Sequence, residues 1–380
     1  MATSFTPSPA VDEIAAAASA VDRDGRFPEE ALQALARDGL LALGVPPAFG
    51  GPGGGPVEVV AAVEAVAGAC ASAGMVYVMH LVATQTVLAG VGGTGGAAPI
   101  RVALDAIVRG EHLSTLAYSE RGSRGHFWAQ LSRAREDGDA ILLDADKTFS
   151  TGAGHVDSYV VATGAPGADD PLVTELYLVP SDTPGLTVPR CFDGLGLRGN
   201  ASAPLELRDV RVDADRRLGA PAGGLALMLE ATLPWFVLGS AACSVGIAGA
   251  AVAASVAHAT HSRLEHLGGT LADVPGVRVR LAQAAIRHAE SRALLYEVAR
   301  QVADGASEAQ AGVLALKAAT GEMATRVTDL CLRVGGGAAY SKAGPLERHF
   351  RDARAASVMA PTTDVLHDFL GKALCGQELF

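Results

Sequence analysis

The side chains that commonly carry catalysis are all present in this chain of 380 residues, but they form no familiar hydrolytic or metal-binding arrangement. No Gly-x-Ser-x-Gly elbow presents a serine nucleophile, and no His-Glu-x-x-His offers ligands to zinc. The five cysteines include no Cys-x-x-Cys pair and have no histidine beside them at metal-ligand spacing. The sequence therefore predicts no metal site, and it indicates small buried cysteines in a reducing compartment.

Polar, aromatic and titratable residues concentrate in the stretch from Leu116 to Gly154. One end contains a tyrosine, a serine, Glu120 and His126, and the other contains Lys147 followed by Thr-Phe-Ser-Thr. Most of the ten histidines are scattered, but His112, His126 and His155 fall in or beside this stretch. We therefore take it as the organising element of the chain.

The middle of that stretch predicts a strand. Asp137-Gly138 is a typical hairpin turn, and the short apolar run Ala140–Asp144 follows it. Further short alternating runs separated by Gly, Pro and Asp follow without a helical pattern between them, at 160–162, 176–179, 186–188 and 205–212. Several strands in succession indicate a small antiparallel barrel or sandwich.

Helical periodicity dominates before and after this block. It predicts helices in 10–36, with a second one opening at Pro28, and in 56–91, 103–111, 223–260, 277–303, 308–334 and beyond 362. We therefore predict an α+β protein of three domains: an N-terminal helical domain (1–112), a middle β domain (113–220) and a C-terminal four-helix bundle (221–380). A cofactor would lie where the bundle faces the strands.

Composition restricts the partners. Apolar residues make up 49% of the chain, which excludes disorder, and the formal net charge of −11 argues against a nucleic-acid partner. The first residues show neither a basic nor an apolar leader pattern, so we expect a cytoplasmic protein. The segment 231–262 has no charged residue and is long enough to span a membrane. Because it is rich in small residues, contains Pro234 and has no second segment like it, we expect a central core helix and no membrane contact.

Two glycine motifs have alternative interpretations. Gly194-Leu-Gly-Leu-Arg-Gly199 fits the dinucleotide-binding pattern, but strand-like residues follow where that pattern requires a helix, so we interpret the match as accidental. Gly335-Gly336-Gly337 ends a helical pattern. It is interpreted either as a helix C-cap or as a place where only glycine fits beside a pyrophosphate.

Five separated motifs, in order, resemble the acyl-CoA dehydrogenase superfamily over nearly the whole chain. Their positions here are Gly44-Val-Pro-Pro-Ala-Phe-Gly-Gly51, Leu116-Ala-Tyr-Ser-Glu120, Lys147-Thr-Phe-Ser-Thr-Gly-Ala153, Leu195-Gly-Leu-Arg-Gly199 with Asp209-Val-Arg-Val212, and Arg348-His-Phe-Arg-Asp-Ala-Arg354. The resemblance implies helical, β and helical domains, FAD at their junction, and a homotetramer, a dimer of dimers, in which a neighbour completes the FAD site.

The resemblance also implies which residues bind FAD. Leu116, Tyr118 and Ser119 would meet the ring edge, Phe149 would lie against the ring in place of the usual Trp, and Ser150 and Thr151 belong to the same segment, with Thr151 able to donate a hydrogen bond. Thr362 occupies the FAD-contacting threonine position. Arg263, Gly335 and Gly336 would hold the pyrophosphate of the neighbouring subunit's cofactor.

The substrate side departs from the family pattern. Counting from Arg351-Asp-Ala-Arg354, the usual catalytic Glu is Ala360, which cannot accept a proton. The residues that match the family's CoA contacts read Leu233-Pro-Trp-Phe-Val237, and the family's Gly-Ser-Asp reads Gly122-Ser-Arg124. Asp364, Glu120, His126 and Glu230 are the candidates for a replacement base, although Asp364 equally suits a helix N-cap.

Two functions fit these observations. The first is flavin-dependent desaturation of an apolar acyl thioester, on coenzyme A or a carrier protein, with electrons passing to an electron-transfer flavoprotein. The second is oxygenation of an apolar or aromatic substrate with reduced flavin supplied by a flavin reductase, favoured by Ala360 and by an aromatic lining of Phe127, Trp128, Trp235 and Phe236. A third, a non-catalytic FAD-binding scaffold, fits less well because the flavin-contacting motifs are intact.

Overall fold

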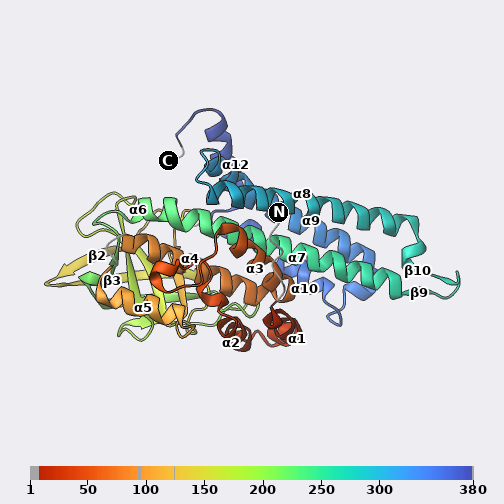
Figure 1. Ribbon diagram of the computed structural model, residues 1–380, viewed down its shortest axis with the longest axis horizontal. Coiled ribbons are helices and arrows are strands. Elements are labelled where there is room, and N and C mark those ends of the chain that lie inside the picture. Colours follow the sequence, from red (N-terminus) through yellow and green to blue (C-terminus); the bar gives the residue numbers. More distant parts are fainter. Residues whose placement is uncertain (1–7, 93–95, 124, 379–380) are drawn as a thin grey trace.

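The computed structural model describes residues 8–92, 96–123 and 125–378. Helices come first, then a β-sheet, then a second set of longer helices (Figure 1). The predicted fold class is therefore confirmed.

The N-terminal helices begin and end where the sequence offers capping groups. The Ser8 side chain accepts a hydrogen bond from the amide of Ala10 at the start of α1, and Gly25, with φ of 62°, ends that helix. The single helix expected over 56–91 is wrong: Cys70 has extended backbone dihedrals and divides it in two. The helices are α1 (Pro9–Asp24), α2 (Glu29–Arg37), α3 (Pro56–Ala69), α4 (Ala71–Val91) and α5 (Ala98–Val108).

Helix α4 runs through the centre of the protein. His80 on α4 ties the first helices to the sheet, because its Nε2 lies 2.9 Å from the Leu41 carbonyl oxygen and its Nδ1 accepts the Ser114 amide at 3.1 Å. Both α4 and the segment Gly224–His261 are long and apolar enough to cross a membrane, so the expectation of a single such segment is wrong. In each, most of the apolar window (78% and 72%) is buried inside the protein, which is how core helices pass the same test.

The middle block is one mixed sheet of eight strands with the order β6-β7-β3-β2-β4-β5-β8, in which β1 also pairs with β4. The Asp137-Gly138 turn joins β2 and β3 as predicted, with Gly138 at φ of 62°. The strands are β1 (Ser114–Ala117), β2 (Arg133–Asp137), β3 (Ala140–Ser150), β4 (Ser158–Gly164), β5 (Thr174–Pro180), β6 (Leu186–Thr187), β7 (Ala203–Asp213) and β8 (Arg217–Leu218).

The expectation of antiparallel pairing throughout is wrong at β4. One edge of this strand pairs antiparallel with β5, while the other edge pairs parallel with β1 and meets β2 in a parallel bridge. The cause is the connection after β1: instead of a tight turn, the described residues 118–123 and 125–132 form an irregular excursion before β2 starts. That excursion carries one wall of the cavity described below.

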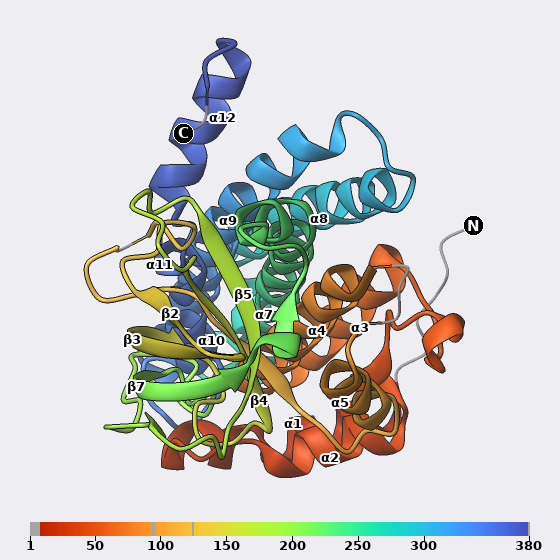
Figure 2. The same cartoon turned by 90° about the vertical axis from the view of Figure 1, so that its left-hand side faces the viewer.

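The long helices of the C-terminal part pack against one another and against α3 and α4 of the N-terminal part (Figures 1 and 2). Helix α12 projects from the rest of the protein, as Figure 2 shows. The elements are α6 (Gly224–Leu227), a π-helical turn η5 (Met228–Thr232), α7 (Leu233–His261), α8 (Pro275–Ala303), α9 (Ala309–Ala339), α10 (Leu346–Asp352), α11 (Ala355–Val358) and α12 (Thr363–Leu374).

One glycine motif lies in turns and the other at a kink in a helix. Residues 194–199 form turns between β6 and β7 with no helix after them, which confirms that the dinucleotide pattern is accidental. Gly336 has φ of 55° and kinks α9. Of the cysteines, Cys70, Cys243 and Cys331 are buried, but Cys191 and Cys375 are exposed, so the prediction of burial is wrong for these two.

Candidate active site

The turn after β1 is held in place by β3. The amide of Thr148 donates to the Ser119 carbonyl oxygen at 2.8 Å, and the amide of Arg121 donates to the Asp146 carbonyl oxygen at 3.2 Å. Between these two bonds, Glu120 and Lys147 form an isolated β-bridge. The organising stretch of the sequence therefore folds back on itself, and its two ends lie side by side.

A buried ion pair holds the same turn from the interior of the protein. The ammonium of Lys147, which is 1% exposed, lies 2.6 Å from Glu120 Oε1 and 2.9 Å from Gln130 Oε1. Glu120 Oε2 accepts the amides of Leu131 and Ser132 at 2.6 and 2.9 Å. Burial raises the pKa of Glu120, but the charge and hydrogen bonds of Lys147 and Ser132 outweigh it and hold that pKa below its usual value. These contacts give Glu120 a positioning role and argue against it as a base.

A β-bulge turns Phe149 toward the same place. The pairing of β3 with β7 shifts register between Lys147 and Ser150, and Phe149 adopts φ of 55°. Its ring is 74% exposed, although most large apolar side chains around it are buried. Ser150 is buried behind it, and the Thr151 hydroxyl lies 2.9 Å from that of Ser202. The left-handed region is unfavourable for a bulky residue, and residues held in such strained conformations are typical of functional sites.

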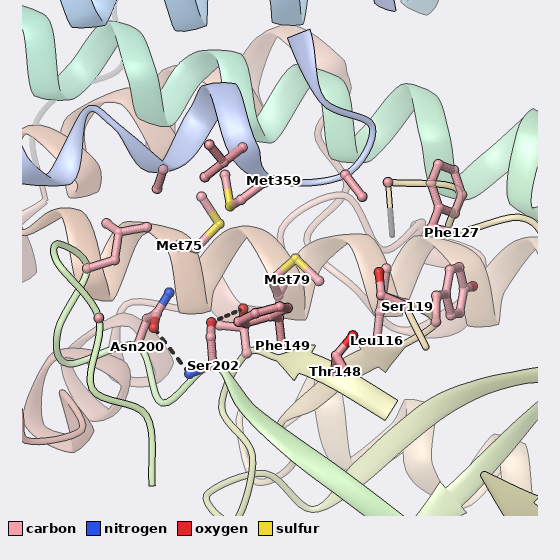
Figure 3. A pocket seen from close by; sticks show the side chains of 18 of the residues that line it. Met75, Met79, Leu116, Ser119, Phe127, Thr148, Phe149, Asn200, Ser202 and Met359 are labelled. Carbon is pink, nitrogen blue, oxygen red and sulfur yellow. Dashed lines mark hydrogen bonds between the residues drawn. The ribbon is translucent and has the colours of Figure 1, made fainter. Parts of the chain in front are cut away.

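These segments form one side of a cavity of about 830 Å³, shown in Figure 3. Met75 and Met79 of α4 lie across the cavity from Phe149, and Met359 lies near them on the segment after α11 (Figure 3). The cavity lies where the N-terminal helices, the sheet and the C-terminal helices meet. Its lining also includes Leu116, Tyr118, Ser119, Phe127, Thr148, Thr151, Leu195, Leu197, Asn200, Ser202, Thr232, Leu233, Phe236, Arg354, Val358, Ala360 and Thr362.

Charged groups are few along this lining. Glu120 is the only carboxylate among the described lining residues, and Lys147 neutralises it. Of the lining arginines, Arg351 lies in ion pairs with Asp22 and Glu347 at 2.6 and 2.7 Å. No histidine belongs to the described lining. The cavity is therefore apolar and aromatic, with a border of hydroxyl groups.

The predicted site residues divide into three groups. Leu116, Tyr118, Ser119, Phe149, Thr151 and Thr362, with Phe127, Phe236 and Ala360, line the cavity together. Trp128 packs behind Phe127 at 5.2 Å between ring centroids, and Trp235 packs against the core, so neither reaches the described lining. Arg263 follows the end of α7, Gly335 and Gly336 lie near the end of α9, and all three are outside the described lining.

The candidate bases other than Glu120 are exposed and lie within two residues of a lining residue in the sequence. His126 lies between Gly125 and Phe127, Glu230 lies in the π-helical turn before Thr232, and Asp364 lies in the first turn of α12, which the Thr362 side chain caps. Arg124, from the altered Gly-Ser-Asp position, lies outside the described residues.

Sequence reasoning missed several residues of the cavity lining. Met75 and Met79 lie on a helix that is apolar on nearly every face, so periodicity does not distinguish a cavity-lining residue from a core residue. Asn200 and Ser202 follow the glycine-rich loop, and the Asn200 side chain accepts the Ser202 amide at 3.2 Å. No signal in the sequence marks them, because the φ of 48° at the intervening Ala201 is visible only in the structure.

Comparison with known proteins identifies the class of this fold and site. Three family models match in order: the N-terminal domain of acyl-CoA dehydrogenases over residues 8–93, the middle domain over 115–210 and the C-terminal domain over 222–375. The chain belongs to the acyl-CoA dehydrogenase family. It is therefore a flavoprotein oxidoreductase of a family that uses FAD and acts on CH–CH donors.

Particular relatives cover almost the full length. The chain is 28% identical to the mitochondrial short-chain specific acyl-CoA dehydrogenase of Bos taurus, with 92% of this chain and 83% of the relative covered. It is also 28% identical to the acryloyl-CoA reductase (NADH) of Anaerotignum propionicum, with 93% and 88% covered. The butyryl-CoA dehydrogenase structure from Megasphaera elsdenii superposes with a TM-score of 0.88 at 23% identity, covering 98% and 100%, which shows the shared fold.

The cavity fits the cofactor of this family. A flavin is a flat, largely apolar ring with a polar edge, so its site needs an apolar wall and hydrogen-bonding groups along one border. The exposed ring of Phe149 provides the wall, and the hydroxyls of Ser119, Thr151 and Ser202 lie on the border. The volume is also within the usual range for ligand pockets, about 300–1,000 Å³.

Proposed function

We propose that this protein removes two hydrogens from an apolar acyl thioester carried by coenzyme A or by a carrier protein. The observation that carries the proposal is the apolar wall of Met75, Met79 and Met359, which lies opposite the Phe149 side of one cavity. An unbranched or lightly substituted acyl chain fits a wall of flexible thioether side chains. Thioester-acting relatives at 28% identity support the substrate class.

On this proposal FAD is held by Leu116, Tyr118, Ser119, Phe149, Thr151 and Thr362 of one chain, while Ser150 is buried behind Phe149, outside the described lining. Bound there, FAD would supply the two-electron oxidation of the substrate. The chain's own residues orient the cofactor and the substrate: Lys147 and Glu120 fix the Tyr118–Ser119 turn, and the bulge fixes Phe149. With cofactor and substrate in the cavity, the apolar wall would exclude water from the reacting carbons.

The proton at the α-carbon needs an acceptor. Ala360 lies in the cavity wall at the position where the family resemblance places a glutamate, and its methyl group accepts no proton. We infer that Glu230, His126 or Asp364, each within two residues of a lining residue and free of a buried ion pair, supplies the base. Changing the true base to its neutral amide (Glu230→Gln, His126→Asn or Asp364→Asn) lowers kcat by about 10²- to 10⁴-fold, and the other two changes leave kcat within a few-fold.

The decisive test is anaerobic titration of the purified FAD-loaded protein with acyl-CoA and acyl-carrier thioesters of different lengths. Desaturation bleaches the oxidised flavin absorbance and yields a product lighter by two hydrogen atoms. Ala360→Glu should then increase the rate of bleaching. If no thioester bleaches the flavin of either the parent protein or Ala360→Glu, the proposal is wrong.

The absence of a free base among the described lining residues favours a second function, oxygenation of an apolar or aromatic substrate with reduced flavin from a reductase. The mass of the product distinguishes oxygenation from desaturation. Oxygenation requires reduced flavin and oxygen and adds one oxygen atom, whereas desaturation proceeds without oxygen. An electron-transfer flavoprotein as acceptor belongs to the first function and a flavin reductase to the second.

We further propose that a second copy completes the FAD site in a homotetramer. Arg263 is exposed and, with Gly335 and Gly336, lies away from its own chain's cavity, as residues that serve a neighbour would. Arg263→Ala should weaken FAD binding about tenfold without altering the fold of the single chain. Light scattering should show four chains per particle; a monomer that retains FAD with full affinity would contradict this arrangement.

A further inference from the structure

A second buried lysine lies beneath the cavity, and its partners are backbone carbonyl groups. Lys317 on α9 is 1% exposed, and its ammonium donates to the carbonyl oxygens of Ala356 and Met359 at 3.0 Å and of Pro361 at 2.8 Å. Among the described residues, no carboxylate lies within 4.0 Å of its Nζ. Burial lowers the pKa of this amine to about 7, which reflects how unfavourable an isolated ammonium is here.

The three carbonyls need these donors. Helix α11 (Ala355–Val358) is a single turn, so its last carbonyl groups have no partner within the helix. The next residues, 359–362, form neither a helix nor a sheet ladder before α12 begins. An ammonium has three N–H donors and the segment presents three acceptors, so the charged lysine satisfies all of them, whereas a neutral amine has only two donors. A cation at the end of a helix is also favourable electrostatically.

The segment that Lys317 holds is a wall of the active-site cavity. Val358, Met359, Ala360 and Thr362 all line it. Figure 3 shows Met359 reaching toward Met75 from this segment. The lysine itself is not part of the lining, so it reaches the ligand only through the backbone that it holds.

We propose that Lys317 is a positioning residue for the segment Ala355–Thr362, and that through this segment it sets the shape of the acyl-binding wall. The acyl substrate in this inference rests on the proposed function. The holding of the segment by Lys317 does not. Lys147 holds the cofactor side of the cavity through a carboxylate, and Lys317 holds the substrate side through carbonyls. The two walls are therefore fixed independently.

The test compares Lys317→Met with the parent protein by hydrogen–deuterium exchange and by steady-state kinetics. Methionine keeps the length and apolar body of the side chain and removes the three donors. Amide exchange within 355–362 should rise at least tenfold, and KM for the best acyl thioester should rise about tenfold while kcat changes less. Thr328→Val is the matched control, because Thr328 is buried on the same helix and bonds only within it, to Ala324 and Thr325.

Unchanged exchange in 355–362, or an equal rise throughout α9 and its neighbours, overturns the proposal. Lys317→Gln, which retains two donors, should give an intermediate rise in exchange, and it is the variant to use if the methionine variant does not fold. Failure of both to fold would show that Lys317 supports the whole bundle, which also overturns it. Because exchange requires no substrate, an inactive enzyme with the expected exchange pattern refutes the proposed substrate and not the positioning role.

Discussion

The ammonium of Lys147 lies 2.6 Å from the carboxylate of Glu120, and both groups are buried beneath the turn that carries Tyr118 and Ser119. Lys147→Met leaves Glu120 as an uncompensated buried charge, so we expect the free energy of unfolding to fall by about 3–5 kcal/mol. The double variant Lys147→Met/Glu120→Gln should recover much of this loss. Urea unfolding measures both.

The exposed pair of Arg300 and Glu297 is the control for that experiment. Arg300→Met should cost less than about 1 kcal/mol, because exposed ion pairs contribute little. A loss in Lys147→Met no larger than in Arg300→Met would show that the buried pair does not hold the turn.

Phe149 should affect stability and cofactor binding in opposite directions. Phe149→Gly relieves a left-handed backbone conformation and should raise the free energy of unfolding by about 1 kcal/mol. It also removes the aromatic wall, so FAD affinity should fall at least tenfold, and Phe149→Trp should retain it. Ala222→Gly is the matched control: Ala222 has φ of 57° outside the cavity lining, so the change relieves strain without affecting FAD. Calorimetry and flavin titration distinguish these outcomes.

His80 predicts a loss of stability in acid. Burial lowers its pKa to about 4 from the usual 6.5, so the folded protein favours the neutral ring. This contribution is fully present above pH 6.5 and is lost as the pH falls toward 4, up to about 3 kcal/mol. His80→Gln should flatten the dependence over that interval, measured as urea midpoints, whereas exposed His261→Gln should not. A parallel dependence in the parent and His80→Gln proteins would contradict the assignment.

Asp352 should make the stability of the fold depend on pH in the opposite direction. Its Oδ1 accepts the Leu197 amide at 2.7 Å, and burial raises the pKa of its carboxyl to about 7 from the usual 3.8. The folded protein therefore favours the protonated form, and stability is lost as the pH rises from about 4 to 7. Asp352→Asn keeps an acceptor for Leu197 without charge, so it should be more stable than the parent above pH 7, by about 2–4 kcal/mol, and similar in acid. Lower stability of Asp352→Asn at pH 8 would contradict this prediction.

Much of the fold could be predicted because helical periodicity and capping residues are local. The break at Cys70 escaped prediction because the break itself carries no glycine or proline, and Gly68, two residues earlier, is still inside α3. Strand β2, Arg-Ala-Arg-Glu-Asp, escaped because its only buried side chain is Ala134. It is stabilised instead by pairing with β3 and by cross-strand ion pairs such as Arg135 with Asp144, which a single strand's pattern does not reveal.

The candidate site was predictable where contiguous residues build it. The segments 116–119 and 149–151 each carry several lining residues in a short motif, so the sequence places them together. The methionines of α4 and Met359 are far apart in sequence and have no polar signature. Only packing brings them to one wall of the cavity. Likewise, only the structure shows that Glu120 forms an ion pair with Lys147.

Asp22 of α1 and Arg351 of α10 are 329 residues apart and form a bidentate ion pair, and the same arginine donates to the Leu195 carbonyl oxygen at the cavity wall. During synthesis, the N-terminal helices and the sheet emerge from the ribosome long before Arg351 does. The catalytic pocket can therefore close only after nearly the entire polypeptide has been translated. Until then, the apolar faces that later line it depend on chaperones or on one another for protection from aggregation.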